Sequence, residues 1–326
     1  MNTMSELDVH RHPDDITEAL RTDVRAGLSA TQKWLPSKWF YDARGSELFE
    51  EITALPEYYP TRAEREVLGR EAAEIARVTG AHTLVELGSG SSEKTRLLLD
   101  GLRGHGSLET FVPLDVSESA LADAVEAISA DYPGLSVRGA IGDFTEHLDL
   151  LPGEQPRLVA FLGGTIGNLT PVERGKFLRS VRDVLAEGEW LLLGTDLVKN
   201  PETLVRAYDD AAGVTAEFNR NVLRVVNQRL GADFDPDGFE HESYWDAEAE
   251  WIEMRLRASA DMLVRIPGAG MEVRFTEGEH IRTEISAKFR AGGIRGELAD
   301  AGFDVERWWT DSGKLFGVSL ARSIRA

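Results

Sequence analysis

The sequence of 326 residues contains no cysteine, which excludes disulfide bonds, thiolate metal sites and a cysteine nucleophile. Cationic residues are scarce too, because 36 Lys and Arg stand against 56 Asp and Glu, a formal net charge of −20. Such a chain repels polyanions and has no long basic run, so we expect neither nucleic acid nor membrane as a partner. No apolar run approaches the ~20 residues of a membrane-crossing helix.

The polar, acidic start of the chain is unlike a signal peptide, and together with the missing cysteines it favours a cytoplasmic protein. The seven histidines show no metal-ligand spacing, so we expect no metal, and we expect His280 at the surface. The hydrophobic content of 42% is that of a globular protein with a core. We expect a monomer.

From residue 83 onward, short apolar runs alternate with helical stretches. Runs such as TLVELG (83–88) and TFVPLD (110–115) are typical of buried parallel strands. The alternation predicts an α/β fold, a Rossmann-like parallel sheet with helices on both faces. Because loops at the carboxyl ends of parallel strands form the ligand crevice, the loops after the following residues should form one site: Leu87, Leu114, Ile141, Leu162 and Leu193.

This pattern stops near residue 200, where a long helical stretch (204–230) is followed by strand-like alternation up to residue 286. The segments 303–311 and 314–323 then read as two closing strands of the first sheet. The middle of the chain is therefore predicted to be an insertion that forms a second α+β lobe.

The loop ELGSGSSEKT (86–95) is open to three interpretations. A phosphate loop needs Gly immediately before Lys, but Glu93 stands there. A dinucleotide fingerprint needs a third glycine, and Glu93 occupies that place too. S-adenosylmethionine (SAM) carries no phosphate, so an acidic residue at a strand end followed by Gly-x-Gly suits it better. We therefore predict SAM as the cofactor.

Three consecutive strand ends supply groups for this donor. Gly88 allows the backbone to approach the methionine part, and Lys94 on the next helix is expected to pair with its carboxylate. Asp115 is expected to accept the ribose hydroxyls, by the logic of the acidic residue in dinucleotide folds. Asp143 is expected to receive the adenine amino group, and Phe144 to contact the ring.

Longer motifs carry a resemblance to a known family. They are VELGSGSSEKT (85–95), GDF (142–144), FLGGTIGNLTP (161–171), LLLGTDLVK (191–199), AYDDAAGVTAEFNRNVL (207–223) and TEISAKF (283–289), with KWFYDARGSELFEEIT (38–53) and LPEYYPTR (55–62) nearer the N-terminus. Together they resemble the histidine-specific methyltransferases of ergothioneine biosynthesis, from Ile16 to the C-terminus. The resemblance implies transfer of three methyl groups from SAM to the α-amino nitrogen of histidine, giving hercynine.

The resemblance also implies a division of the chain and the roles of further residues. A class I methyltransferase sheet (63–196 and 289–326) would bind SAM, a second domain (13–62 and 197–288) would bind the amino acid, and residues 1–12 would be a flexible lead-in. The implied substrate-binding residues are Tyr58, Asn168 and Tyr208 for the α-amino and carboxylate groups, Glu284, Ile285 and Ser286 for the imidazole, and Phe49, Met254 and Tyr41 around the pocket.

Three side chains can be argued further from chemistry. Glu284 and Ser286 lie two apart on an alternating strand, so both should face one side and bond the two ring nitrogens. Tyr41 is the candidate catalytic residue, steering the amine and passing its proton to water, with a packed aromatic as the alternative. Cation–π contacts from Tyr41, Phe49 and Tyr58 would suit a trimethylammonium product.

Other functions stay open at this point. The same chemistry on another small amino acid or amine is the first alternative. A binding module without turnover is the second, and a nicotinamide oxidoreductase the third.

Overall fold

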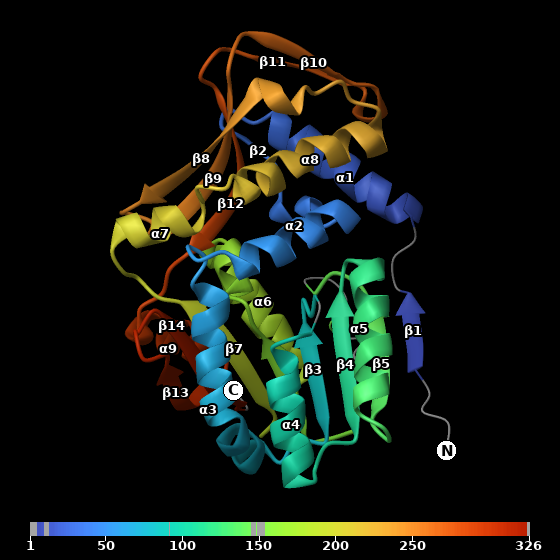
Figure 1. Ribbon diagram of the computed structural model, residues 1–326, viewed down its shortest axis with the longest axis vertical. Coiled ribbons are helices and arrows are strands. Elements are labelled where there is room, and N and C mark those ends of the chain that lie inside the picture. The colour runs from blue at the N-terminus through green and yellow to red at the C-terminus, as the bar shows by residue number, and fades with distance from the viewer. Residues whose placement is uncertain (1–4, 10–12, 91, 145–147, 149–153, 325–326) are drawn as a thin grey trace. The chain divides into compact units, whose positions relative to one another are not determined.

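The computed structural model describes residues 5–9, 13–90, 92–144, 148 and 154–324 (Figure 1). The chain divides into two compact units, of which the first comprises Met1–His10, Pro60–Val198 and Lys288–Ala326. The second comprises Arg11–Tyr59 and Lys199–Ala287. These boundaries lie within a few residues of the predicted ones. The predicted boundary at residue 63 differs because helix α3 (Pro60–Thr79) is continuous from Pro60.

The first unit is built on a sheet of eight strands in the order β1-β5-β4-β3-β6-β7-β14-β13. The strands from β1 to β7 in this order are parallel, whereas β14 is antiparallel to β7 and to β13. Counted from β3, this is the 3-2-1-4-5-7-6 order of class I methyltransferases, so the predicted fold class is confirmed. The strands are β1 (Ser5–Val9), β3 (Thr83–Leu87), β4 (Thr110–Asp115), β5 (Ser136–Ile141), β6 (Arg157–Phe161), β7 (Trp190–Asp196), β13 (Phe303–Thr310) and β14 (Phe316–Ser323).

Helices connect these strands and bury the sheet. Apolar side chains of α3, α4 (Thr95–His105) and α5 (Glu118–Asp131) form one core with alternate residues of the strands, including Leu84, Phe111 and Leu192. Helix α6 (Pro171–Val184) contacts α9 (Ala291–Asp300). The start of α6 is fixed by a capping box between Thr170 and Glu173.

Residues Ser5–Val9 correct one prediction. They form β1, which pairs in parallel with β5 from Ser5↔Val137 to Val9↔Ile141, so the predicted flexible lead-in is wrong for this stretch. An edge strand offers unpaired backbone groups to any segment that reaches it. That partner lies far away in the sequence, so local composition gave no sign of it. Residues 1–4 and 10–12 lie outside the described part.

The second unit combines helices with a four-stranded sheet in the order β2-β12-β9-β8. Strand β9 is antiparallel to both of its neighbours, and a separate hairpin is formed by β10 and β11. The long helix α8 contacts β8 and β9, and α2 in turn contacts α8. The elements are α1 (Pro13–Leu28), β2 (Lys33–Trp34), η1 (Ser37–Phe40), α2 (Ala43–Ala54), α7 (Pro201–Ala207), α8 (Val214–Leu230), β8 (Phe239–Asp246), β9 (Trp251–Ala258), β10 (Met262–Ile266), β11 (Met271–Phe275) and β12 (His280–Ala287).

None of the helices in the described residues is long and apolar enough to pass through a bilayer.

Candidate active site

The glycine loop after β3 is tied to the loops after the next two strands. Gly88 and Gly90 have φ of +69° and +49°, a region that favours glycine. The amide of Gly88 donates to the Leu114 carbonyl (2.8 Å), and the amide of Gly90 donates to Oδ2 of Asp115 (2.8 Å). The amide of Gly142 donates to the carbonyl of Asp115 (3.0 Å). The strand ends predicted to hold the donor therefore meet at one edge of the sheet.

The Asp115 carboxylate is held by backbone amides at both oxygens. Oδ1 accepts from the amide of Ser117 (2.9 Å), while Oδ2 accepts from Gly90. Burial raises the pKa of Asp115, an effect that the backbone donors partly offset. Each oxygen keeps a further lone pair, so the carboxylate is oriented and still able to accept from a ligand.

Glu86, the acidic residue near the end of β3, stabilises the glycine loop through hydrogen bonds. Its side chain is buried and accepts from Thr95 Oγ1 (2.5 Å) and Ser92 Oγ (3.3 Å). Burial raises the pKa of Glu86 to about 7. The carboxyl group thus joins the loop to the first turn of α4.

Lys94, which precedes α4, forms an ion pair with Glu64 of α3. The Glu64 side chain is fully buried and also accepts from the amide of Gly163, which follows β6 (2.9 and 3.0 Å). Gly194 on β7 makes room for it, because a Cβ there would lie 2.1 Å from Glu64 Oε1. Lys94 is therefore fixed beside the glycine loop by a buried carboxylate.

Asp143 and Phe144 follow β5. The Asp143 side chain is buried, and Phe144 packs against Phe161 and Phe177 with ring centroids 5.0 and 5.6 Å away. Asn168, which ends the short helix η3 (Thr165–Asn168) beyond β6, is half-buried in the same unit.

The second unit brings together aromatic residues that were predicted to bind the amino acid. Tyr41 meets Phe49 edge-on (5.7 Å), Phe49 meets Tyr58 (6.3 Å), and Tyr58 meets Tyr208 (6.2 Å). The hydroxyl of Tyr208 lies 2.7 Å from Ser286 Oγ. A continuous set of rings therefore leads to the strand that carries the predicted imidazole-binding residues.

Strand β12 places those residues by its register with β9. Glu284 pairs with Met254 and Ser286 pairs with Ile252, so these four side chains share one face of the sheet. Ile285 pairs with Glu253 and points its side chain to the other face. Ser286 is buried and Glu284 is half-buried.

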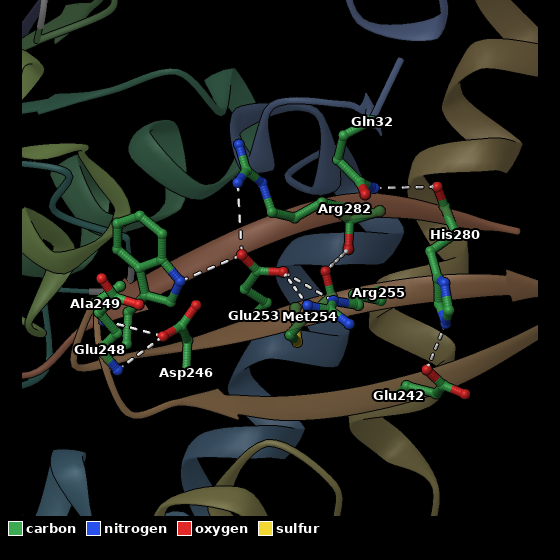
Figure 2. A network of polar contacts seen from close by, with 12 residues as sticks. Gln32, Glu242, Asp246, Glu248, Ala249, Glu253, Met254, Arg255, His280 and Arg282 are labelled. Atoms are coloured by element: carbon green, nitrogen blue, oxygen red, sulfur yellow. Dashed lines mark hydrogen bonds and ion pairs between the residues drawn. The ribbon is translucent and has the colours of Figure 1, made fainter. Parts of the chain in front are cut away.

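The other face of this sheet is polar (Figure 2). Glu253 accepts from Arg255 (2.8 Å) and from Trp251 Nε1 (3.2 Å), and Arg282 Nη1 lies 3.5 Å from it. His280 Nε2 lies 2.8 Å from Glu242. The two faces of the sheet thus have different chemistry, one lined by ion pairs and the other by Met254, Glu284 and Ser286.

Comparison with known proteins decides the family. The profile of the family described as "Histidine-specific methyltransferase, SAM-dependent" matches residues 20–323. The chain belongs to this family. This methyltransferase is 56% identical over 308 residues to the histidine N-alpha-methyltransferase of Mycolicibacterium smegmatis, covering 94% of this chain and 96% of the relative. It is 55% identical over 303 residues to the enzyme of that name from Mycobacterium tuberculosis, covering 93% and 94%.

A more distant relative is the ergothioneine biosynthesis protein 1 of Schizosaccharomyces pombe, 32% identical over 243 residues, which are 71% of this chain and 31% of the relative. The predicted family resemblance and the predicted dependence on SAM are confirmed. The phosphate-loop and dinucleotide interpretations of the glycine loop are thereby set aside.

Three polar residues near these sites were not predicted: Glu64, Asn219 and His241. Glu64 left a signal in the sequence, because it occupies the apolar stripe of its helix together with Val67 and Leu68. An acidic side chain at such a position needs a buried partner. Asn219 and His241 carry no comparable local signal, since their partners lie on other elements.

Proposed function

We propose that this methyltransferase transfers three methyl groups in succession from SAM to the α-amino nitrogen of L-histidine, giving hercynine, the first step of ergothioneine biosynthesis. The observation that carries the proposal is the 56% identity, over nearly the whole chain, to a histidine N-alpha-methyltransferase. The proposal includes action as a monomer in the cytoplasm.

The edge of the first sheet where the loops after β3, β4 and β5 meet supports SAM binding in four respects. Gly88 is exposed, and glycine at the left-handed positions 88 and 90 lets a ligand approach the backbone closely. The Asp115 carboxylate is oriented by backbone amides and retains lone pairs for two hydroxyl groups. Lys94 supplies a cation for a carboxylate. Asp143 and Phe144 would take the adenine, by its amino group and its ring.

The second unit would hold the amino acid. Tyr58 and Tyr208, whose rings are neighbours in this unit, would bind its α-amino and carboxylate groups. Glu284 and Ser286 share a face, so one carboxylate and one hydroxyl can bond the two ring nitrogens, while Met254 packs beside the ring. Ile285, whose side chain lies on the other face, would contribute through its backbone.

The chemistry is an in-line displacement in which a nitrogen lone pair attacks a methyl carbon. When bound, SAM supplies an electrophilic methyl group on a sulfonium. The protein must hold the nitrogen and the carbon ~3–3.5 Å apart and in line with the sulfur. The α-ammonium must also lose a proton before each attack, and Tyr41 would steer the amine and pass that proton to water.

The product carries a fixed positive charge. Aromatic faces stabilise such a charge by about 0.5–2 kcal/mol each. Tyr41, Phe49 and Tyr58 are neighbours in the second unit and would provide these faces.

Mass spectrometry of L-histidine incubated with the purified protein and SAM tests the proposal. We expect species with one, two and finally three added methyl groups, with fragmentation placing them on the α-amino nitrogen. A panel of other amino acids serves as the control. S-adenosylhomocysteine formation with another amino acid and none with histidine would overturn the proposal, as would ring methylation.

A further inference from the structure

Strand β12 contains one residue more than its partner over the stretch where the two are paired. Arg282 pairs with Arg255 and Glu284 pairs with Met254, so Thr283 has no opposite residue on β9. This is a β-bulge, which commonly re-aims a side chain beside a functional site.

The bulge decides which face Glu284 and Ser286 occupy. In a regular strand, residues two apart share a face, so Glu284 would lie on the side of Arg282. That side carries the ion pairs of Glu253 with Arg255 and Arg282 (Figure 2). The extra residue moves Glu284 and Ser286 to the opposite face, which Met254 shares. A shift of one residue in register has this effect on every later side chain.

Buried hydrogen bonds hold the extra residue. The hydroxyl of Thr283 lies 2.5 Å from Asn219 Oδ1 and 3.0 Å from the carbonyl of Met254. The Asn219 amide also donates to the carbonyl of Arg255 (3.0 Å). The side chains of Asn219 and Thr283 are 0% and 1% exposed. Helix α8 is therefore hydrogen-bonded to both β9 and β12 at the bulge through the side-chain amide of Asn219.

The same amide fixes a histidine. Asn219 Nδ2 lies 2.8 Å from His241 Nδ1, and His241 Nε2 lies 2.8 Å from the carbonyl of Tyr208. Because the Arg255 carbonyl requires the amide nitrogen of Asn219 on that side, His241 Nδ1 accepts and Nε2–H donates to Tyr208. Burial lowers the pKa of His241, which favours this neutral form.

These bonds close a ring within the second unit. From Thr283 they run through Asn219 and His241 to Tyr208, whose hydroxyl returns to Ser286 three residues after Thr283. We propose that Asn219, His241 and Thr283 are positioning residues that maintain the β12 bulge and the place of Tyr208, and so determine selectivity for an imidazole side chain. This inference rests on the proposed function.

The first test compares Thr283→Val, which keeps the shape and removes the hydroxyl, with Thr283→Ser, which keeps the hydroxyl. We expect Thr283→Val to raise the KM for histidine about 10-fold or more with kcat changed much less, since a buried partner is lost. Its preference for histidine over tryptophan, measured as the ratio of kcat/KM values, should fall by a similar factor. SAM affinity, measured by calorimetry without histidine, should not change, and Thr283→Ser should resemble the wild type.

A second pair of variants tests the other end of the ring. His241→Gln can still donate to the Tyr208 carbonyl, whereas His241→Phe cannot. We expect only His241→Phe to raise the histidine KM. All kinetic constants are calculated per concentration of folded protein, which is determined by titration with SAM.

If Thr283 and His241 had a purely structural role, their substitutions would lower the melting temperature and leave the KM for histidine and the histidine preference unchanged. That result in Thr283→Val and in His241→Phe would overturn the inference. The wild type is assayed first with the amino-acid panel, and failure to use histidine would overturn the proposed function instead. In that case the variants are compared with the wild type on the amino acid that the wild type accepts. An unchanged KM for that amino acid in Thr283→Val and His241→Phe would again overturn the positioning role.

Discussion

Lys94 and Glu64 form an ion pair beside the glycine loop (86–95), and the carboxylate of this pair is completely buried. Glu64 also accepts from the amide of Gly163 beyond β6. One carboxylate therefore connects α3, the start of α4 and the loop after β6. An ammonium group has three donors, so Lys94 can hold Glu64 and a ligand carboxylate together.

Replacing Lys94 by methionine should weaken SAM binding by about 10-fold or more, because the proposed charge-assisted hydrogen bond from Lys94 to the SAM carboxylate would be lost. Titration calorimetry with SAM measures this. The single variant also leaves Glu64 buried without its partner, which costs stability by itself.

The double variant Glu64→Gln with Lys94→Met separates the two effects. It carries no unpaired buried charge, so its stability should recover while its SAM affinity stays low. Recovery of SAM affinity in the double variant would show that Lys94 serves only as the partner of Glu64.

Gly194 has a steric role that can be tested. Alanine at this position would bring its Cβ within 2.1 Å of Glu64 Oε1, so the carboxylate would have to move. We expect Gly194→Ala to destabilise the protein by about 1–3 kcal/mol and to weaken SAM binding. Thermal and denaturant unfolding measure the first effect.

Gly69→Ala is the matched control. Gly69 is exposed on α3 and a Cβ there meets nothing within 4 Å. Because alanine is the better helix former, this variant should be more stable by roughly 0.5–1 kcal/mol. Equal effects of the two substitutions would contradict the steric role of Gly194.

The meeting of the strand ends after β3, β4 and β5 at one edge of the sheet was predictable because its signals are local. Strand ends, glycines and single acidic residues repeat on consecutive strands, and the parallel arrangement dictates that they meet. This rule is sufficient to bring Gly88, Asp115 and Asp143 to one edge of the sheet, and backbone hydrogen bonds do join their loops.

Strand β12 was predictable only in part. Alternation correctly indicated that Glu284 and Ser286 share a face. It could not indicate which face, because the bulge at Thr283 depends on Asn219, which is 64 positions away in the sequence. The edge strand β1 was missed for the same physical reason, since its partner β5 is distant in sequence.

Glu86 should make stability depend on pH. Burial raises its pKa from 4.5 to about 7, so the folded state binds a proton more tightly than the unfolded state. This stabilising contribution is complete below about pH 4.5 and is lost as pH rises through 7. Glu86→Gln should therefore gain stability relative to the wild type across this window, by up to about 3 kcal/mol.

Urea unfolding at a series of pH values measures that difference. Glu93→Gln, an exposed position of the same loop, is the control; it removes only a surface ion pair with Arg96, worth at most about 1 kcal/mol, so its effect should stay below that of Glu86→Gln. A difference between Glu86→Gln and the wild type that does not grow from pH 4.5 to 7 would argue against a buried, partly protonated carboxyl group.

Glu284 should set the choice of amino acid. Its side chain is half-buried opposite Met254, on the face that also carries Ser286. Under the proposed function Glu284 accepts from an imidazole N–H, and Glu284→Ala would remove that acceptor, which typically costs about 1–3 kcal/mol. We expect kcat/KM for histidine to fall about 10- to 100-fold, with less loss for tryptophan, whose uptake does not require that acceptor.

Steady-state kinetics with both amino acids gives the result, and Glu242→Gln provides the control. Glu242 is an acidic residue of the same sheet on the polar face, beside His280 (Figure 2), so its replacement should leave both efficiencies unchanged. Equal losses in the two variants would mean that the charge of the sheet, rather than the face selected by the bulge, governs histidine use. Unchanged histidine efficiency in Glu284→Ala would place the imidazole elsewhere and remove the role assigned to this strand.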